Sequence, residues 1–118
     1  MNYLQAVQEI TNVIPDIQKE LHSSKAQNAY NIIQIFTERI KNMIRQNDRN
    51  ILFKCLEKID YIYENGDNAL KNAIENTFIY SLDNSIVYCS HEYRKMIFSH
   101  ISRNLQKSYL RQIYNHGV

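Results

Sequence analysis

The residues best placed to do chemistry are carboxylates that recur along one segment near the middle of the chain. Glu57, Asp60 and Glu64 follow one another at steps of three and four residues, which on a helix places them in one stripe opposite the apolar residues. Paired carboxylates can act as general acid and base, but that role requires a cleft, which an exposed helix face does not supply. The sequence therefore predicts a charged surface here and no catalytic site.

This acidic stripe has two possible explanations. A helix ordinarily carries a solvated polar face opposite its apolar one, and this is the commoner explanation. The alternative is a partner-binding surface, because Tyr61 lies within the stripe, Lys58 is the only basic residue that interrupts it, and tyrosine is favoured at the centres of protein interfaces. On that alternative, the candidate partner-binding residues are Glu57, Asp60, Tyr61, Glu64 and Asp67.

A second group of potential ligands lies farther along the chain, where Cys89, His91 and Glu92 are close in sequence. Zinc sites are built from ligand pairs such as CxxC or HxxxH with a second pair elsewhere, and neither pair occurs here. No glycine-rich phosphate loop is present either. We therefore expect no metal and no cofactor.

Three other polar residues fall beside apolar or small ones. Asn72 and Asn76 are spaced to share one helix stripe with two alanines, so we expect their amides to tie the helix to a neighbouring loop, with contact to a partner protein as the alternative. His100 falls on the apolar side of its segment. We expect it to be a core histidine bonded to a backbone carbonyl.

The elements that must position these residues are helical. The 118 residues are 44% hydrophobic and 22% charged, with only 2 glycines and 1 proline, which leaves little material for the turns of an all-β fold. This length suits one domain, residues 1–118. The cysteines, Cys55 and Cys89, form no disulfide framework. No segment has the apolar length to span a bilayer, and the polar N-terminal residues do not suit a signal peptide, so we expect a cytoplasmic protein.

The clearest boundary is at Gly66 and Asp67. Glycine can adopt the left-handed conformation that closes a helix, and an aspartate can cap the helix that follows. Apolar residues at three- and four-residue steps predict helices over residues 49–65 and 67–82 on either side of this turn. The segment from 60 to 82 is therefore predicted to be a helical hairpin.

The same periodicity predicts the remaining elements. Pro15 should separate a helix over 2–13 from a short one over 15–22, a polar linker over 23–27 should precede a long helix over 29–46, and 83–85 should break the hairpin's second helix. Ser90 should cap a helix over 91–101, and Gly117 should close a last one that begins after a turn at 102–104. The prediction is one all-α domain of six or seven helices, packed as consecutive antiparallel hairpins in a bundle or short solenoid. Its predicted core is Phe36, Ile40, Ile44, Leu52, Cys55, Leu56, Ile59, Ile62, Leu70, Ile74 and Phe78.

Several short segments carry a family resemblance. The order Ile14-Pro15-Asp16-Ile17, then Gly66-Asp67, Asn72-Ala73-Ile74-Glu75-Asn76, Phe78 and Ser81-Leu82 resembles an uncharacterised group of small bacterial all-helical proteins. The resemblance spans roughly residues 3–115. It implies an immunity protein of a polymorphic-toxin system, and it supplies no catalytic residues.

The C-terminal part of the chain raises a different possibility. Residues 91–118 hold five basic residues against one acidic residue, although the whole chain has a net charge of only +2. Because Arg94, Lys95, Arg103, Lys107 and Arg111 are spread over two helices, we expect at most weak, salt-sensitive binding to nucleic acid. The function expected is that of a non-enzymatic protein-binding domain that neutralises a cognate bacterial toxin. The alternative is a helical adaptor or regulatory scaffold without a toxin partner.

Overall fold

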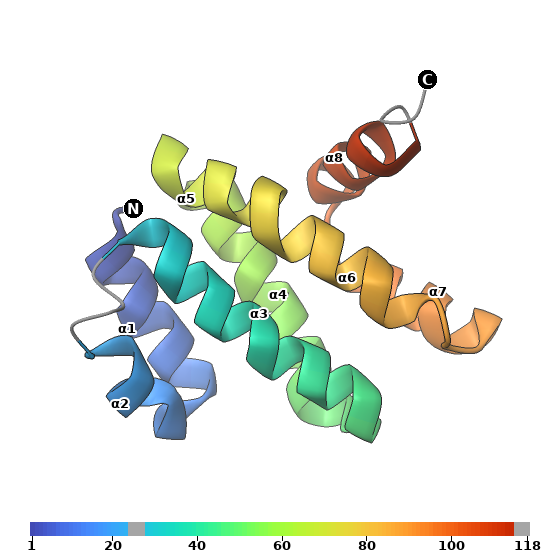
Figure 1. The fold of residues 1–118 in the computed structure, drawn as a ribbon, viewed down its shortest axis with the longest axis horizontal. Helices are drawn as coiled ribbons and strands as arrows, with labels where there is room; N and C mark the ends of the chain where they lie inside the picture. Colours follow the sequence, from blue (N-terminus) through green and yellow to red (C-terminus); the bar gives the residue numbers. More distant parts are fainter. Residues whose placement is uncertain (24–27, 115–118) are drawn as a thin grey trace.

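The regular structure of the chain is helical throughout the part that can be described. The computed structural model describes residues 1–23 and 28–114, and Figure 1 shows their helices in chain order. The helices are α1 (Tyr3–Val13), α2 (Gln18–Leu21), α3 (Ala29–Gln46), α4 (Arg49–Asn65), α5 (Asn68–Ala73), α6 (Ile79–Ile86), α7 (His91–Ser99) and α8 (Arg103–Tyr114). A 3-10 turn, Pro15–Ile17, leads into α2, and a π-helical segment, Ile74–Phe78, joins α5 to α6. With α5 and α6 taken as one helix, residues 1–23 and 28–114 form seven helices, which confirms the predicted all-α fold.

Most helix boundaries lie close to the predicted ones, and side chains cap several of the helix starts. Asn2 Oδ1 accepts a hydrogen bond from the Gln5 amide at 2.9 Å, and the Gln5 side chain accepts one from the Asn2 amide at 2.9 Å. This reciprocal pair satisfies two of the free amides at the start of α1. Ser90 Oγ likewise accepts from the Tyr93 amide at 3.2 Å to start α7. Residues 24–27 of the linker predicted over 23–27, and the predicted role of Gly117, lie outside the described residues.

The end of α4 is built differently from the prediction. Gly66 has φ −76° and ψ 159°, an extended conformation, so it does not close α4 in the left-handed region. The N-terminal amine of Met1 donates to the Asn65 carbonyl at 3.0 Å, and the Asp67 amide donates to the Met1 carbonyl at 2.8 Å. Polar groups at this helix end are thus paired with the N-terminal residue, and a left-handed cap is not needed. Within residues 1–23 and 28–114, the residue with the left-handed conformation is Asn47, with φ 58°, at the end of α3.

The predicted break at residues 83–85 is also wrong, since α6 continues to Ile86. Ser85 Oγ donates to the Ser81 carbonyl at 2.7 Å inside the helix, and Asp83 accepts a hydrogen bond from the Tyr109 hydroxyl of α8. Ser85 thus bonds to its own helix and Asp83 bonds to α8, so neither side chain terminates α6. The buried Leu82 and Ile86 continue the apolar face.

The π-helical segment keeps that face continuous. The Ile79 amide bonds to the Ile74 carbonyl, five residues earlier, which accommodates one extra residue in a turn. Ile74, Phe78 and Ile79 are all buried as a result. The helix from α5 to α6 therefore presents one apolar stripe to α3 along its length.

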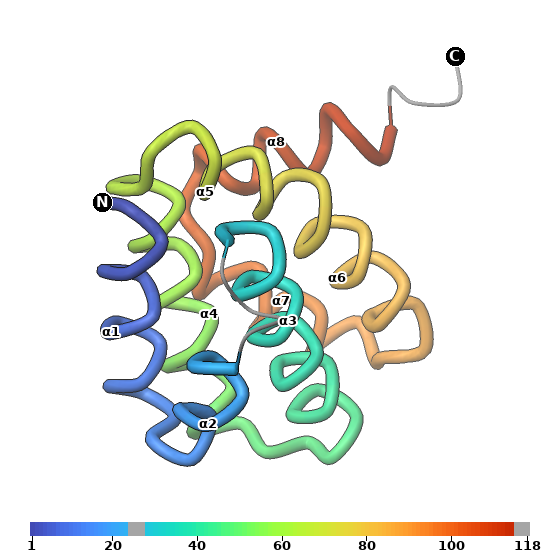
Figure 2. Tube along the Cα trace, turned by 60° about the vertical axis from the view of Figure 1, so that its left-hand side comes forward, coloured from blue at the N-terminus to red at the C-terminus, as the bar shows by residue number. Residues whose placement is uncertain are grey.

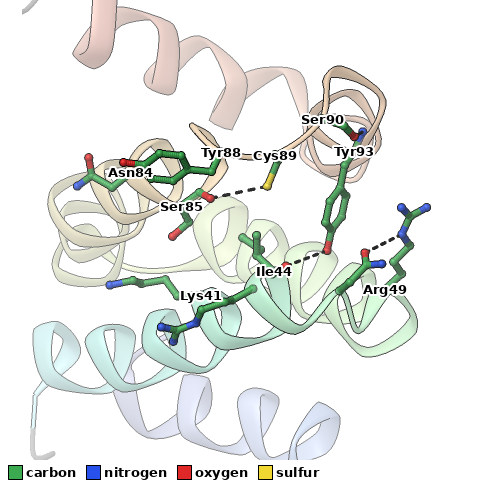
Figure 3. A pocket seen from close by; sticks show the side chains of 11 residues that line it. Lys41, Ile44, Arg49, Asn84, Ser85, Tyr88, Cys89, Ser90 and Tyr93 are labelled. Atoms are coloured by element: carbon green, nitrogen blue, oxygen red, sulfur yellow. Dashed lines mark hydrogen bonds between the residues drawn. The ribbon is translucent and has the colours of Figure 1, made fainter.

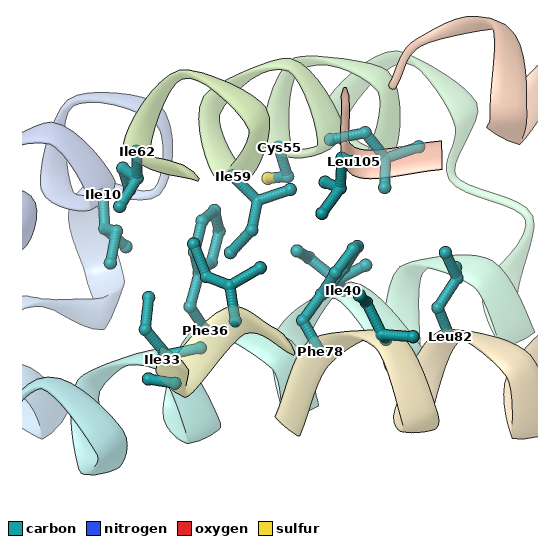
Figure 4. Close-up of a cluster of buried hydrophobic side chains, with 14 of the residues drawn as sticks. Ile10, Ile33, Phe36, Ile40, Cys55, Ile59, Ile62, Phe78, Leu82 and Leu105 are labelled. Carbon is teal, nitrogen blue, oxygen red and sulfur yellow. The ribbon is translucent and has the colours of Figure 1, made fainter. Parts of the chain in front are cut away.

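The core lies between α3, α4 and the α5–α6 helix. In Figure 1, α3 and α5–α6 run beside each other while α4 returns behind them, which is the predicted series of antiparallel hairpins. Figure 4 shows side chains from these helices, among them Ile40, Ile59 and Phe78, converging in the core. All the predicted core residues are at most 4% exposed, which confirms the set: Phe36, Ile40, Ile44, Leu52, Cys55, Leu56, Ile59, Ile62, Leu70, Ile74 and Phe78.

The remaining helices cover the two sides of this core. Helix α1 packs along α4, and α8 lies across the other side and contacts α6, as Figure 2 shows. Within residues 1–23 and 28–114, none of the helices combines the length and the apolar character needed to span a membrane. The outer faces of α4, α3 and the α6–α7 connection carry the residues considered next.

Candidate functional site

The predicted acidic stripe lies on the outer face of α4, between α1 and the connection from α7 to α8. Glu57, Tyr61, Glu64 and Asp67 are exposed, whereas Asp60 is half-buried. The five candidates therefore share a region of the surface, but their local roles differ.

Two of the carboxylates hold another part of the chain. Asp60 Oδ1 accepts a hydrogen bond from the Ser102 amide at 3.2 Å. Glu64 Oε1 accepts from Ser102 Oγ at 3.3 Å and from Asn104 Nδ2 at 3.2 Å. Ser102 Oγ also accepts from the Leu105 amide in the first turn of α8, at 3.3 Å. Asp60 and Glu64 therefore anchor the start of α8, a role that sequence reasoning did not identify because the pairing joins distant segments.

Glu57 faces the C-terminal end of α7. Its Oε1 lies 3.5 Å from His100 Nδ1, and the His100 ring stacks on Phe53 with ring centroids 4.0 Å apart. His100 is half-buried, and it pairs with this carboxylate and not with the backbone carbonyl that was predicted. The Glu57 side chain nevertheless remains 63% exposed, so most of it is accessible to a partner.

Tyr61 is the aromatic group of this surface, and 47% of it is exposed. The Lys58 ammonium lies 5.3 Å from the centre of its ring and also forms a 2.8 Å ion pair with Glu9 of α1. Tyr61 borders a shallow recess of about 440 Å³ between α1 and α4, lined by Met1, Gln5, Gln8, Glu9 and Asn65 as well. Asp67, at the end of the stripe, caps α5 by accepting from the Leu70 amide at 3.0 Å.

The residues considered for metal or amide chemistry are not assembled into a site. The described part of the chain contains no group of three His, Cys, Asp or Glu side chains that could hold a metal ion. The Cys89 thiol donates to the Ser85 carbonyl with 3.7 Å between Sγ and the oxygen. Burial raises the pKa of this thiol above its usual value, and the nearby charge of Arg94 offsets only part of that rise. Asn72 and Asn76 are exposed beside a recess of about 360 Å³, and within residues 1–23 and 28–114 neither amide bonds to a neighbouring loop.

Four of the basic residues of α7 and α8 line two separate recesses. Arg94 and Lys95 line a shallow recess on α7, whereas Lys107 and Arg111 line another beside α4 and α5. Arg111 also lies 3.8 Å from Glu75. This dispersion is the arrangement anticipated from the sequence.

A hydrogen-bonded cluster beneath Arg111 fastens α8 to the core. The Tyr63 hydroxyl donates to Glu75 Oε1 at 2.6 Å and lies 2.8 Å from Ser108 Oγ of α8. Burial and the bond to Glu75 raise the pKa of Tyr63. The cluster joins α4, the π-helical segment and α8, so it has a structural role.

A further hollow in the described surface is a groove that sequence reasoning missed. It measures about 610 Å³ and lies between the C-terminal end of α3, the start of α4 and the α6–α7 connection (Figure 3). Its lining includes three basic residues, Lys41, Arg45 and Arg49, and no carboxylate. A sequence signal existed, since Lys41 and Arg45 lie one turn apart on α3, but basic character was predicted only for the C-terminal part.

The floor of this groove is held in place by α7. The Tyr93 hydroxyl donates to the Ile44 carbonyl at 3.4 Å, and the Arg49 guanidinium lies 4.8 Å from the centre of the Tyr93 ring. Burial raises the pKa of Tyr93, so this hydroxyl remains protonated as a donor. The groove therefore has an apolar floor of fixed shape beneath basic side chains.

Comparisons with known proteins identify a family but no established activity. Residues 7–115 match a family described as a domain of unknown function, DUF7674. No curated protein and no solved structure matches the chain. Because the family match covers most of its length, the chain belongs to this family.

Proposed function

We propose that this member of the DUF7674 family is a non-enzymatic protein-binding domain that neutralises a cognate bacterial toxin. The observation that carries the proposal is an exposed tyrosine, Tyr61, held beside an exposed carboxylate, Glu57, on a rigid helix. The resemblance to immunity proteins of polymorphic-toxin systems supports the choice of a toxin as partner. We name this pair of residues, together with the recess between α1 and α4 that Tyr61 borders, the α4 face.

The α4 face suits protein recognition because its central residue is already positioned. The Lys58 ammonium is placed between Glu9 and the Tyr61 ring, so α1 and α4 are linked beneath the exposed aromatic edge. A side chain held in one arrangement before binding loses less conformational entropy when a partner arrives. Tyrosine is also enriched among the residues that dominate interface energies.

The charge of the α4 face indicates what kind of partner surface fits it. Glu57 is exposed, and its internal contact, His100, is 3.5 Å away at the edge of the face. An acidic, aromatic surface complements a basic one, and complementary charge speeds the encounter of two proteins. A toxin that acts on nucleic acid or another anionic substrate would present such a basic region. Glu57 and Tyr61 are the residues that we expect to contact it.

Asp60, Glu64 and Asp67 take a different part in this proposal. They anchor α8 or cap α5, so their substitution would alter the scaffold as well as any interface. A test of binding should therefore leave them intact. We expect them to frame the α4 face from its α8 side and its C-terminal end.

The test is co-expression with the C-terminal domain of a secreted toxin encoded beside this gene. Wild-type protein should restore growth and co-purify with the toxin domain. The double variant Glu57→Lys/Tyr61→Ala should lose both properties. The matched control Tyr30→Ala/Glu92→Lys makes the same two kinds of change at exposed positions on α3 and α7 and should protect like wild type.

Two outcomes would contradict the proposal at different levels. If the wild-type protein neither protects nor co-purifies, the toxin assignment is wrong for that pair, and an adaptor without a toxin partner becomes the better explanation. If the Glu57→Lys/Tyr61→Ala variant folds and protects fully, the partner binds elsewhere. Far-ultraviolet circular dichroism and thermal unfolding establish folding, and because both residues are exposed we expect stability to change by only about 0.5 kcal/mol.

A further inference from the structure

The groove at the end of α3 is independent of the α4 face and has the opposite charge. Lys41 and Arg45 come from α3 and Arg49 from the first turn of α4, while the opposite wall is formed by the α6–α7 connection. No carboxylate is among the lining residues. A concave surface lined by one sign of charge concentrates ligands of the other sign.

The charges of the groove are only weakly neutralised from within. Arg49 donates to the amide oxygen of Asn47 at 3.0 Å and contacts Met96 Sδ at 3.5 Å, and Arg45 bonds to Asn42, so both arginines have uncharged partners. Lys41 has a 3.4 Å ion pair with Glu38 on its own helix, where Glu38 is exposed and Lys41 is partly exposed. Exposed pairs of this kind contribute little and exchange readily. Asp48 is near Tyr93 but does not line the groove.

The groove also offers apolar surface. Ile44 and Tyr93 form a floor whose geometry is fixed by the hydrogen bond between them. Tyr88 lines the wall and is 94% exposed, and its neighbour Val87 is 59% exposed. Figure 3 shows Tyr93 reaching from α7 toward Ile44, with Tyr88 at the other end of the groove. Exposed apolar side chains beside basic ones favour a ligand that combines apolar and anionic groups.

We propose that this groove binds an acidic peptide segment of a partner protein, with its carboxylates on Lys41, Arg45 and Arg49 and an apolar side chain against Ile44 and the two tyrosines. Guanidinium groups match carboxylates in a two-point geometry. A free phosphate would engage only the basic side chains, whereas a peptide can also cover the apolar surface that Tyr88 exposes. The proposal does not depend on the α4 face or on a toxin partner.

The test uses a short fluorescein-labelled peptide of glutamates around one phenylalanine, with fluorescence anisotropy as the readout at low salt. The wild-type protein should bind this peptide, bind a lysine-containing counterpart far more weakly, and lose affinity as salt is raised. The variant Lys41→Glu/Arg45→Glu should bind the acidic peptide at least about tenfold more weakly. The control Lys95→Glu/Arg103→Glu makes the same change in net charge on α7 and α8 and should retain most of the affinity.

A second variant and a footprint locate the ligand within the groove. Tyr88 is almost fully exposed, so Tyr88→Ala should leave folding unchanged and still weaken binding several-fold. Cys89 lines the groove, whereas Cys55 is 0% exposed in the core. Saturating peptide should therefore slow alkylation of Cys89 and leave Cys55 unaffected.

The proposal is overturned by any of four results. The first is that the acidic peptide does not bind the wild-type protein at low salt. The second is that both charge-reversal variants lose affinity equally, which would indicate attraction to net charge alone. The third is that Cys89 is not protected, which would place the peptide elsewhere. The fourth is that a single-stranded oligonucleotide competes at lower concentration than the peptide, which would change the ligand class to nucleic acid.

Discussion

Replacing Gly66 with alanine tests why a glycine stands at the end of α4. The backbone there is extended, with φ −76°, so any residue could adopt it. The space is the constraint: a Cβ at this position would lie 2.6 Å from the Ile62 carbonyl oxygen and 2.8 Å from Leu70 Cβ. Neither atom lies at the end of a flexible side chain, so the contact can be relieved only by moving the turn between α4 and α5.

The expected cost follows from two opposing effects. Overpacking of this kind costs about 1–3 kcal/mol, and the reduced flexibility of the unfolded chain returns about 0.4–1 kcal/mol. The net loss for Gly66→Ala should be about 1–2 kcal/mol, a drop in Tm of roughly 5–10 °C for a domain of this size. Urea unfolding followed by circular dichroism measures it directly.

Comparison with asparagine separates the two explanations for the glycine. A left-handed cap would accept asparagine better than alanine, whereas a crowded extended turn should reject both equally. Gly66→Asn should therefore be no more stable than Gly66→Ala. Asn47, with φ 58°, is the internal control: Asn47→Ala should cost about 1 kcal/mol more than Asn47→Gly. A Gly66→Asn variant that is clearly more stable than Gly66→Ala would refute the reasoning.

Three further predictions concern the core. Ile59 and Phe78 are 0% and 1% exposed. Truncating either to alanine should lower the free energy of unfolding in urea by about 2–5 kcal/mol. A loss below about 0.5 kcal/mol at both positions would contradict their assignment to the core. Thr37 is 1% exposed, and its hydroxyl has no hydrogen-bond partner among the described residues, so Thr37→Val should raise the free energy of unfolding by about 1 kcal/mol; a loss of stability would imply a partner for the hydroxyl. Burial raises the pKa of Cys55 from 9.0 to about 12, so its contribution to stability is complete below about pH 9 and is lost as pH rises toward 12. Unfolding measured from pH 8 to pH 10.5 should show stability falling less steeply in Cys55→Ala than in wild type, and parallel curves would contradict the shift.

The helices and the core were largely predictable because they depend on local information. Apolar residues at helical spacing identified α1, α3, α4 and the start of the α5–α6 helix, and all the predicted core residues are buried. Asn2 was not predicted to be a helix cap, but the predicted start of α1 lies within one residue of the observed start. Asp67 and Ser90 were predicted as caps and act as caps. A periodic apolar face and a capping side chain each operate within a few residues of sequence, so no long-range contact is needed to recognise them.

The errors occur where a distant segment supplies a partner. The left-handed assignment of Gly66 failed because the Asn65 carbonyl and the Asp67 amide, on either side of Gly66, pair with the N-terminal residue. The break predicted at residues 83–85 failed because Asp83 is paired with Tyr109 of α8. His100 pairs with Glu57, which is far away in sequence. In each case the actual partner lies far away in the sequence, so a local sequence pattern does not identify it.

The candidate surfaces show the same contrast between local and long-range information. The acidic stripe on α4, with a tyrosine in it, could be predicted because spacing along one helix decides which residues share a face. The packing of α8 against α4 made Asp60 and Glu64 anchors of α8 and left Glu57 and Tyr61 exposed. Tertiary packing also brought basic residues from α3 and α4 together with Tyr88 and Tyr93 in one groove. The physical reason is that both arrangements depend on how separate helices pack, and packing joins residues whose distance in sequence carries no periodic signal.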